Sequence, residues 1–165
     1  MNESDTAILL VEDSPSDLKL TLHALRGRNL ANRIDVARDG QEALDYLFCR
    51  GPHAGRSFDH PPRVVLLDLK LPGLDGMDVL RAVKSDPRTK TIPVVILTAS
   101  SEERDLVESY NLGVNAYVQK PVDFDRFRDM VDQIGLFWLV VNQPPLAQPV
   151  GLPVGLRAEA VAHAK

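Results

Sequence analysis

Five short runs of apolar, mostly β-branched residues punctuate the chain, and a segment with helical spacing follows each of them. The runs cover residues 7–11, 33–37, 63–67, 93–97 and 116–119. The first, third and fourth are apolar without alternation, which is typical of strands that helices cover on both faces. This order of strands and helices predicts an α/β fold, (βα)5, with a five-stranded parallel sheet between two helical layers.

Helix start signals support this reading. Ser14 and Pro15 offer a cap and a proline at the first helical position, and Asp17 places an acid in the first turn. We expect further helices over residues 39–50 and 101–111, after residue 76 and from residue 123. Residues 51–62 are rich in proline and glycine and should form a long surface loop.

Composition sets outer limits on the chain. We divide it into a folded domain over residues 1–142 and a Pro/Gly/Ala-rich tail over residues 143–165, where prolines interrupt helical hydrogen bonding. The formal net charge of −4 argues against nucleic-acid binding. No apolar run approaches the roughly 18–20 residues of a membrane span, so we expect no membrane partner. Cys49 has no partner for an internal disulfide, and we expect a reducing, cytoplasmic location.

Polar side chains stand at the ends of four of the five predicted strands. Glu12 and Asp13 follow the first, Asp68 follows the third, Thr98 ends the fourth, and Lys120 follows the fifth. Because the carboxyl ends of parallel strands meet at one edge of a sheet, we expect these groups to share one crevice.

The chemistry of this set points to phosphoryl transfer. Three crowded carboxylates repel one another unless a cation joins them, and oxygen ligands with open positions suit Mg²⁺. A carboxylate can act as a nucleophile and carry a phosphoryl group. Asp68 is the expected acceptor, because it ends the central apolar strand. Lys120 would supply positive charge and Thr98 a hydroxyl to the transferred group.

Four segments resemble the receiver domains of two-component response regulators. They are VEDSP (11–15), VLLDLKLPGLDG (65–76), ILTA (96–99) and YVQKP (117–121), in the family's order, and the likeness spans residues 6–138. The resemblance implies a flavodoxin-like (βα)5 three-layer fold with strand order 2-1-3-4-5. It also implies that the chain is a phosphoacceptor switch rather than an enzyme, although it takes part in its own phosphorylation and dephosphorylation.

By position, the resemblance assigns roles to single residues. Glu12, Asp13, Asp68 and the backbone carbonyl of Lys70 would bind Mg²⁺. Asp68 would take the phosphoryl group from a sensor histidine kinase, with Thr98 and Lys120 contacting it. Thr98 and Tyr117 match the family's switch pair. The bond between Lys120 and Pro121 would be cis, a form that proline makes accessible.

A narrower resemblance is to the small regulators that partner phytochrome-type photoreceptor kinases. It rests on the 51–62 loop and on the Phe137-Trp138 ending followed by residues 142–145. Those relatives form homodimers, and here Tyr110, Phe137, Trp138 and Val141 are the expected interface. Residues 136–141 are apolar on every side of a helix, so a homodimer or the folded-back tail would cover them.

The sequence is less consistent with three other functions. Aspartyl-phosphate hydrolases use a second Asp two residues after the nucleophile, where this chain has Lys70. A nucleotide- or flavin-binding module would need a glycine- or hydroxyl-rich loop after the first strand, where Glu12 and Asp13 stand. A transcription factor would need a DNA-binding domain, for which residues 143–165 leave no room. Output is therefore expected through protein contacts: an unidentified target, a phosphorelay or a dimer.

Overall fold

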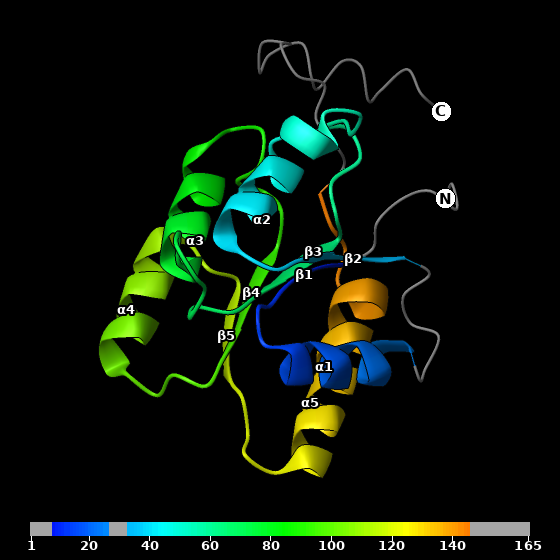
Figure 1. Cartoon of the computed structure of the whole chain (residues 1–165), viewed down its shortest axis with the longest axis vertical. Helices are drawn as coiled ribbons and strands as arrows, with labels where there is room; N and C mark the ends of the chain where they lie inside the picture. Colours follow the sequence, from blue (N-terminus) through cyan, green and yellow to red (C-terminus); the bar gives the residue numbers. More distant parts are fainter. Residues whose placement is uncertain (1–7, 27–32, 146–165) are drawn as a thin grey trace.

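Five parallel strands form the centre of the molecule in the order β2-β1-β3-β4-β5, as a computed structural model of the chain shows (Figure 1). The structure describes residues 8–26 and 33–145. The strands are β1 (Ile8–Val11), β2 (Ile34–Ala37), β3 (Val64–Leu67), β4 (Val94–Thr98) and β5 (Ala116–Gln119). This confirms the flavodoxin-like topology and each expected strand to within one residue at either end.

Five helices connect or follow these strands. They are α1 (Pro15–Arg26), α2 (Gly40–Leu47), α3 (Gly76–Ser85), α4 (Glu103–Leu112) and α5 (Phe124–Leu136). Side-chain caps fix three of the starts: Asp39 accepts from the Glu42 N–H, Asp75 forms a capping box with Asp78, and Asp123 accepts from the Arg126 N–H. The helix expected over residues 39–50 is shorter than predicted, because the chain turns at Phe48.

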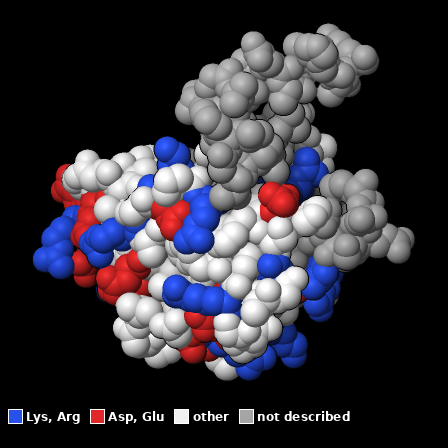
Figure 2. All heavy atoms as spheres, turned by 90° about the horizontal axis from the view of Figure 1, so that it is seen from above, with Lys and Arg blue, Asp and Glu red and all other residues white. Residues whose placement is uncertain are grey.

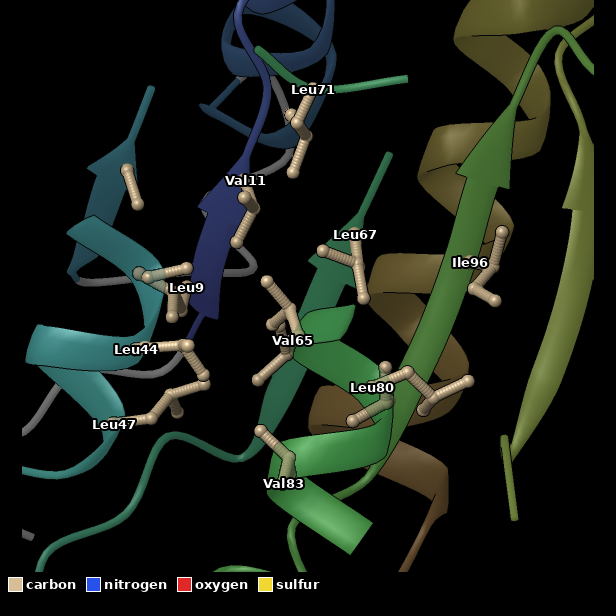
Figure 3. Close-up of a cluster of buried hydrophobic side chains, with 14 of the residues drawn as sticks. Leu9, Val11, Leu44, Leu47, Val65, Leu67, Leu71, Leu80, Val83 and Ile96 are labelled. Carbon is tan, nitrogen blue, oxygen red and sulfur yellow. The ribbon is translucent and has the colours of Figure 1, made fainter. Parts of the chain in front are cut away.

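Each face of the sheet has its own apolar core. On one face, side chains of β1, β3 and β4 meet those of α2 and α3, as Figure 3 shows for Leu9, Val65 and Leu80. On the other face, Leu10 and Leu66 belong to a cluster with residues of α1 and α5. The α4 helix packs on α3, and α5 packs on α1. Strands β1, β3 and β4 are wholly buried because both of their faces are covered.

The 51–62 segment is a tied loop rather than an irregular one. It opens with a short 3-10 turn, η1 (Gly51–His53), and Arg56 ties it to the last turn of α2. The Arg56 guanidinium lies 3.6 Å from the ring centroid of Tyr46 and donates hydrogen bonds to the carbonyl oxygens of Tyr46 and His60. The loop precedes β3 and therefore lies at the amino ends of the strands.

A lysine also ties the amino ends of the strands together. The Lys84 ammonium, at the end of α3, donates to the carbonyl oxygens of Lys90 at 3.1 Å and Ile92 at 2.9 Å, and to Asn115 Oδ1 at 2.9 Å. Asn115 Oδ1 in turn accepts from the Val94 N–H at 2.8 Å. Burial lowers the pKa of Lys84 to about 8.

After α5 the helical chain widens into one π-helical turn, η2 (Phe137–Val141), where the Asn142 N–H donates to the Phe137 carbonyl at 2.7 Å. Most of the expected tail, residues 146–165, lies outside the described residues. No helix within residues 8–26 and 33–145 is long and apolar enough to cross a membrane. On the face that Figure 2 shows, acidic and basic side chains are interspersed rather than gathered by sign.

One expectation from the family resemblance is not met. Among the described residues no peptide bond is cis, so the bond between Lys120 and Pro121 is trans. The trans isomer is the lower in energy even before proline, and Lys120 reaches its partners from it.

Candidate functional site

The carboxyl ends of the strands bring three carboxylates together, as the sequence predicts. Glu12, Asp13 and Asp68 each offer an oxygen within 4.8 Å of the others. Glu12 and Asp68 are buried, at 3% and 7% exposure, whereas Asp13 is exposed. Two carboxylates are thus removed from bulk water beside a third that faces it. This arrangement has buried oxygen ligands on one side and an open side toward solvent.

Within residues 8–26 and 33–145, one ammonium contacts this cluster. Lys120 Nζ donates to Glu12 Oε2 at 2.7 Å, to Asp68 Oδ2 at 2.9 Å and to Asp17 Oδ2 at 2.9 Å. The contacts with Glu12 and Asp68 are buried, and the Lys120 side chain is only 6% exposed. One positive charge therefore faces four carboxylates, counting Asp13. The donor set and its excess negative charge fit a divalent cation.

Electrostatics at the site follow from burial and pairing. Burial raises the pKa of Glu12 to about 7, and the hydrogen bond from Lys120 offsets only part of that shift. Burial by itself would lower the pKa of Lys120, but its hydrogen bonds to Glu12, Asp17 and Asp68 outweigh this and raise it. Lys120 is therefore charged throughout the physiological pH range.

The loop after β3 fixes Asp68 through backbone contacts. The Lys70 N–H donates to Asp68 Oδ1 at 3.2 Å, and the Gly76 N–H donates to the Leu69 carbonyl at 3.0 Å. At Gly76 a Cβ atom would overlap the Asp68 carbonyl oxygen and the Leu69 Cα. Gly76 is thus required for close approach of α3 to the strand end. Gly73, with φ of +71°, is the glycine of this loop that needs the left-handed region.

Thr98 and Tyr117 are linked through one residue. The Thr98 side chain is fully buried, and its Oγ1 accepts from the Ser100 N–H at 3.2 Å. The half-buried Tyr117 donates its hydroxyl to the Ser100 carbonyl at 3.2 Å. Ser100 Oγ in turn donates to Asp105 Oδ2, on α4, at 2.6 Å. A movement of Thr98 would therefore be transmitted through Ser100 to both Tyr117 and α4.

The four residues expected at a dimer interface fall on two elements. Tyr110 lies on α4 and is 55% exposed. Phe137 and Val141 lie on η2, at 47% and 58% exposure. Trp138 is half-buried against the α1–α5 core, with its ring edge-on to Phe137 at 5.0 Å between centroids. Tyr110 thus belongs to the helix layer that packs on α3, and Trp138 to the α1–α5 side of the sheet.

Asp17 contacts Lys120 as well, although its sequence position predicts no role in the site. In the sequence it is only an acid in the first turn of a helix, where it favours helix formation. The available signal was its place: the first turn after β1 faces the same edge of the sheet as Glu12 and Asp13. The structure gives no contact for the Lys70 carbonyl, so its role as a ligand stays a prediction.

A family model gives the first comparison with known proteins. The model described as "Response regulator receiver domain" matches residues 8–132. The response regulator Rcp1 of Synechocystis sp. is 39% identical over 140 residues, which are 85% of this chain and 93% of Rcp1. A structure of the Mn²⁺-bound form of Rcp1 matches with a TM-score of 0.79 and 38% identity, over 85% of this chain and 99% of that one.

Two further solved structures are similar. The phosphorylated cyanobacterial phytochrome response regulator RcpA matches with a TM-score of 0.80 and 39% identity, over 86% of this chain and 99% of that chain. The bacteriophytochrome response regulator RtBRR matches with a TM-score of 0.67 and 52% identity, over 84% and 82%. Each of these structures matches at least 84% of this chain.

Proposed function

The chain belongs to the response regulator receiver family, and on that premise we propose that it is a signalling switch with Asp68 as its phosphoacceptor. The observation that carries this assignment is the Asp68 carboxylate at the end of β3. It lies beside two further acids and 2.9 Å from the Lys120 ammonium. The likeness to the phosphorylated regulator RcpA supports it.

In the proposed reaction an oxygen of Asp68 attacks the phosphorus of a kinase phosphohistidine. The new P–O bond forms as the P–N bond breaks, and the imidazole nitrogen keeps the electron pair and takes up a proton from solvent. Glu12, Asp13, Asp68 and the Lys70 carbonyl would hold Mg²⁺, which when bound offsets negative charge on the phosphoryl oxygens. The Mn²⁺-bound structure of Rcp1 supports a divalent cation in such a site.

Lys120 and Thr98 would then contact the transferred group. Lys120 lies against Asp68 and is charged, so it can neutralise a phosphoryl oxygen. The Thr98 hydroxyl accepts from the Ser100 N–H and still has its own O–H to donate to a phosphoryl oxygen. Because the Ser100 carbonyl accepts from Tyr117, a movement of Thr98 toward the phosphoryl group would shift Ser100 and with it the Tyr117 ring, which would bias the equilibrium between two arrangements of the α4–β5 face.

A sensor histidine kinase is the proposed phosphodonor, and a phytochrome-type photoreceptor kinase is the preferred kind. Two similar structures, RcpA and RtBRR, are described as phytochrome and bacteriophytochrome response regulators. The signal would leave through a protein target, a phosphorelay, or a homodimer using Tyr110, Phe137, Trp138 and Val141. The exposure of Phe137 and Val141 supports such a contact. The receiver unit over residues 1–142, the 143–165 tail and a cytoplasmic location belong to the same proposal.

Phosphorylation by acetyl phosphate tests the assignment directly. The purified protein is incubated with and without Mg²⁺ and read by intact mass. We expect a single, metal-dependent phosphoryl adduct in the wild type and none in Asp68→Asn. Asp125→Asn, which removes an exposed acid from the first turn of α5, is the matched control and should retain the adduct. An adduct of equal size in Asp68→Asn would rule out Asp68 as the acceptor.

A further inference from the structure

Asp17 stands outside the three carboxylates that suit a cation, yet it shares their ammonium. Its Oδ2 accepts from Lys120 Nζ at 2.9 Å, a contact that joins the first turn of α1 to the end of β5. The Asp17 side chain is 37% exposed, whereas that of Lys120 is 6% exposed. Asp17 is therefore the solvent-side partner of a largely buried charge.

Two side chains hydrogen-bond to the backbone of Asp17 and hold this residue in place for its contact with Lys120. The Ser14 hydroxyl accepts from the Asp17 N–H at 3.4 Å, and the Thr21 hydroxyl donates to the Asp17 carbonyl at 2.8 Å. Both bonds lie within α1 or its start, so the first turn fixes the Cα of Asp17 above the strand ends. The start of α1 thus fixes the position from which the Asp17 carboxylate reaches Lys120.

The three donors of Lys120 are all in use. An ammonium has three N–H groups, and those of Lys120 are taken by Glu12, Asp17 and Asp68. For Lys120 to keep its bond to Asp68 and also donate to a phosphoryl oxygen there, one of its other two bonds must be given up. Asp17 is the partner with the most access to water, so its carboxylate loses least on release.

Charge acts in the same direction as donor sharing. The oxygens of Asp17 and Asp68 lie at equal distances of 2.9 Å from the same nitrogen, so the two carboxylates are close neighbours. Phosphorylation adds further negative charge on Asp68, which the negative charge of Asp17 opposes. The unmodified state of Asp68 is favoured by both effects.

We infer that Asp17 is a positioning residue that competes with the phosphoryl group on Asp68 for the Lys120 ammonium. It thereby sets how strongly the pocket holds a phosphoryl group. This inference rests on the proposed function, because it concerns the same acceptor. It adds a residue on α1 that determines the balance between the two states of the switch.

Equilibrium binding of beryllofluoride, an analogue of the acyl phosphate, measures this competition without turnover. Binding is followed by ¹⁹F NMR at saturating Mg²⁺ in the wild type, Asp17→Asn, Asp17→Glu and Asp125→Asn. We expect Asp17→Asn to bind beryllofluoride about threefold to tenfold more tightly than the wild type. The substitution removes a partly screened negative charge and weakens the hydrogen bond that Asp17 accepts from Lys120. Asp17→Glu, which keeps the charge, and Asp125→Asn, which removes a first-turn acid elsewhere, should stay within about twofold of wild type.

The possible results distinguish the role of Asp17 from the acceptor role of Asp68. Tighter binding in Asp17→Asn alone supports the competition, since a merely structural loss would weaken binding. Unchanged or weaker binding in Asp17→Asn, with the wild type binding normally, overturns the inference and leaves the acceptor role of Asp68 intact. A wild type that neither binds beryllofluoride nor forms an adduct with acetyl phosphate overturns both.

Discussion

Two lysines tie opposite ends of the same sheet, and their environments differ in kind. At the carboxyl ends of the strands, Lys120 donates its three hydrogen bonds to carboxylates. At the amino ends, Lys84 donates three to neutral oxygens, two of them backbone carbonyls. The pKa of Lys120 is raised by its acids in spite of burial, whereas burial lowers the pKa of Lys84 to about 8.

The difference shows how one fold separates structure from switching. The partners of Lys84 cannot change their charge, so this ammonium serves as a fixed link among α3, β4 and β5. The partners of Lys120 are acids that a cation or a phosphoryl group can engage instead, so its bonds can be redistributed. The same donor geometry is therefore structural at one end of the sheet and responsive at the other.

The largest effect that tests the contrast between Lys120 and Lys84 is expected on the free energy of unfolding in the absence of Mg²⁺. Lys120→Met leaves Glu12 and Asp68 buried beside each other without a counter-ion, and we expect it to lower the free energy of unfolding by about 3 kcal/mol. Added Mg²⁺ should restore most of that loss, since the cation no longer competes with an ammonium. Urea denaturation with and without Mg²⁺ measures both.

Lys84→Met is the matched variant for that experiment. Its lost hydrogen bonds are offset by removal of a partly buried charge, so the free energy of unfolding should change by less than about 1 kcal/mol. Added Mg²⁺ should have no larger effect on it than on the wild type. A Mg²⁺-sensitive loss in Lys84→Met would show that the two ends of the sheet are not independent.

The next effect is on phosphoryl uptake. Lys120→Met removes the positive charge beside Asp68, and we expect the rate of adduct formation with acetyl phosphate to fall about tenfold to a hundredfold. Lys84→Met should stay within about twofold of wild type, because Lys84 lies at the other end of the strands. Intact-mass time courses at fixed Mg²⁺ give both rates. Equal rates in Lys120→Met and wild type would contradict the role proposed for Lys120.

A smaller effect is the pH dependence of stability from Lys84. Its folded pKa of about 8 lies below the ordinary 10.5, so between these values the unfolded chain holds a proton that the folded chain has released. Stability contributed by Lys84 should therefore rise with pH over this window. The measurement is the difference in unfolding free energy between wild type and Lys84→Met from pH 7 to pH 10. A difference that stays constant or falls would show that Lys84 retains its proton.

The smallest expected effect comes from giving Lys84 an acid of its own. Asn115→Asp places a carboxylate at the position that now accepts from Lys84 at 2.9 Å, which should raise the lysine pKa. We expect the rise in stability between pH 8 and pH 10 to shrink or disappear, while adduct formation on Asp68 is unchanged. The same pH series, run on this variant, checks it. Persistence of the full rise would mean that charge on the partner does not set the difference between the two lysines.

The proximity of Asp68 and Lys120 could be predicted from the sequence because both residues follow strand ends. Apolar runs marked β1, β3 and β4, and a parallel sheet brings the residues after such runs to one edge. Asp68 and Lys120 are 52 residues apart in sequence, yet this rule alone placed them together. The rule depends only on backbone direction, which the pattern of strands and helices determines.

Contacts made by long side chains were outside the reach of that rule. Asp17 sits on a helix, where a first-turn acid has a sufficient local explanation, and its contact with Lys120 depends on how α1 packs on the rest of the fold. Among the described residues the acceptors of Lys84 are two backbone carbonyls and an amide oxygen, and a sequence does not single out such neutral partners. The trans bond before Pro121 likewise depends on a small energy difference that sequence does not reveal.

The Arg56 tie has a practical consequence for manipulating the chain. Because the Arg56 guanidinium donates to the carbonyls of both Tyr46 and His60, the segment between these two residues is held at both ends by the same side chain. A Cβ at Gly55 would meet no atom within 4 Å, so this position of the loop is open to solvent. A fluorophore or an affinity peptide inserted at Gly55 would project from the surface at the amino ends of the strands, whereas Asp68 lies at their carboxyl ends. Such a graft would report on partners of the protein while leaving its chemistry untouched.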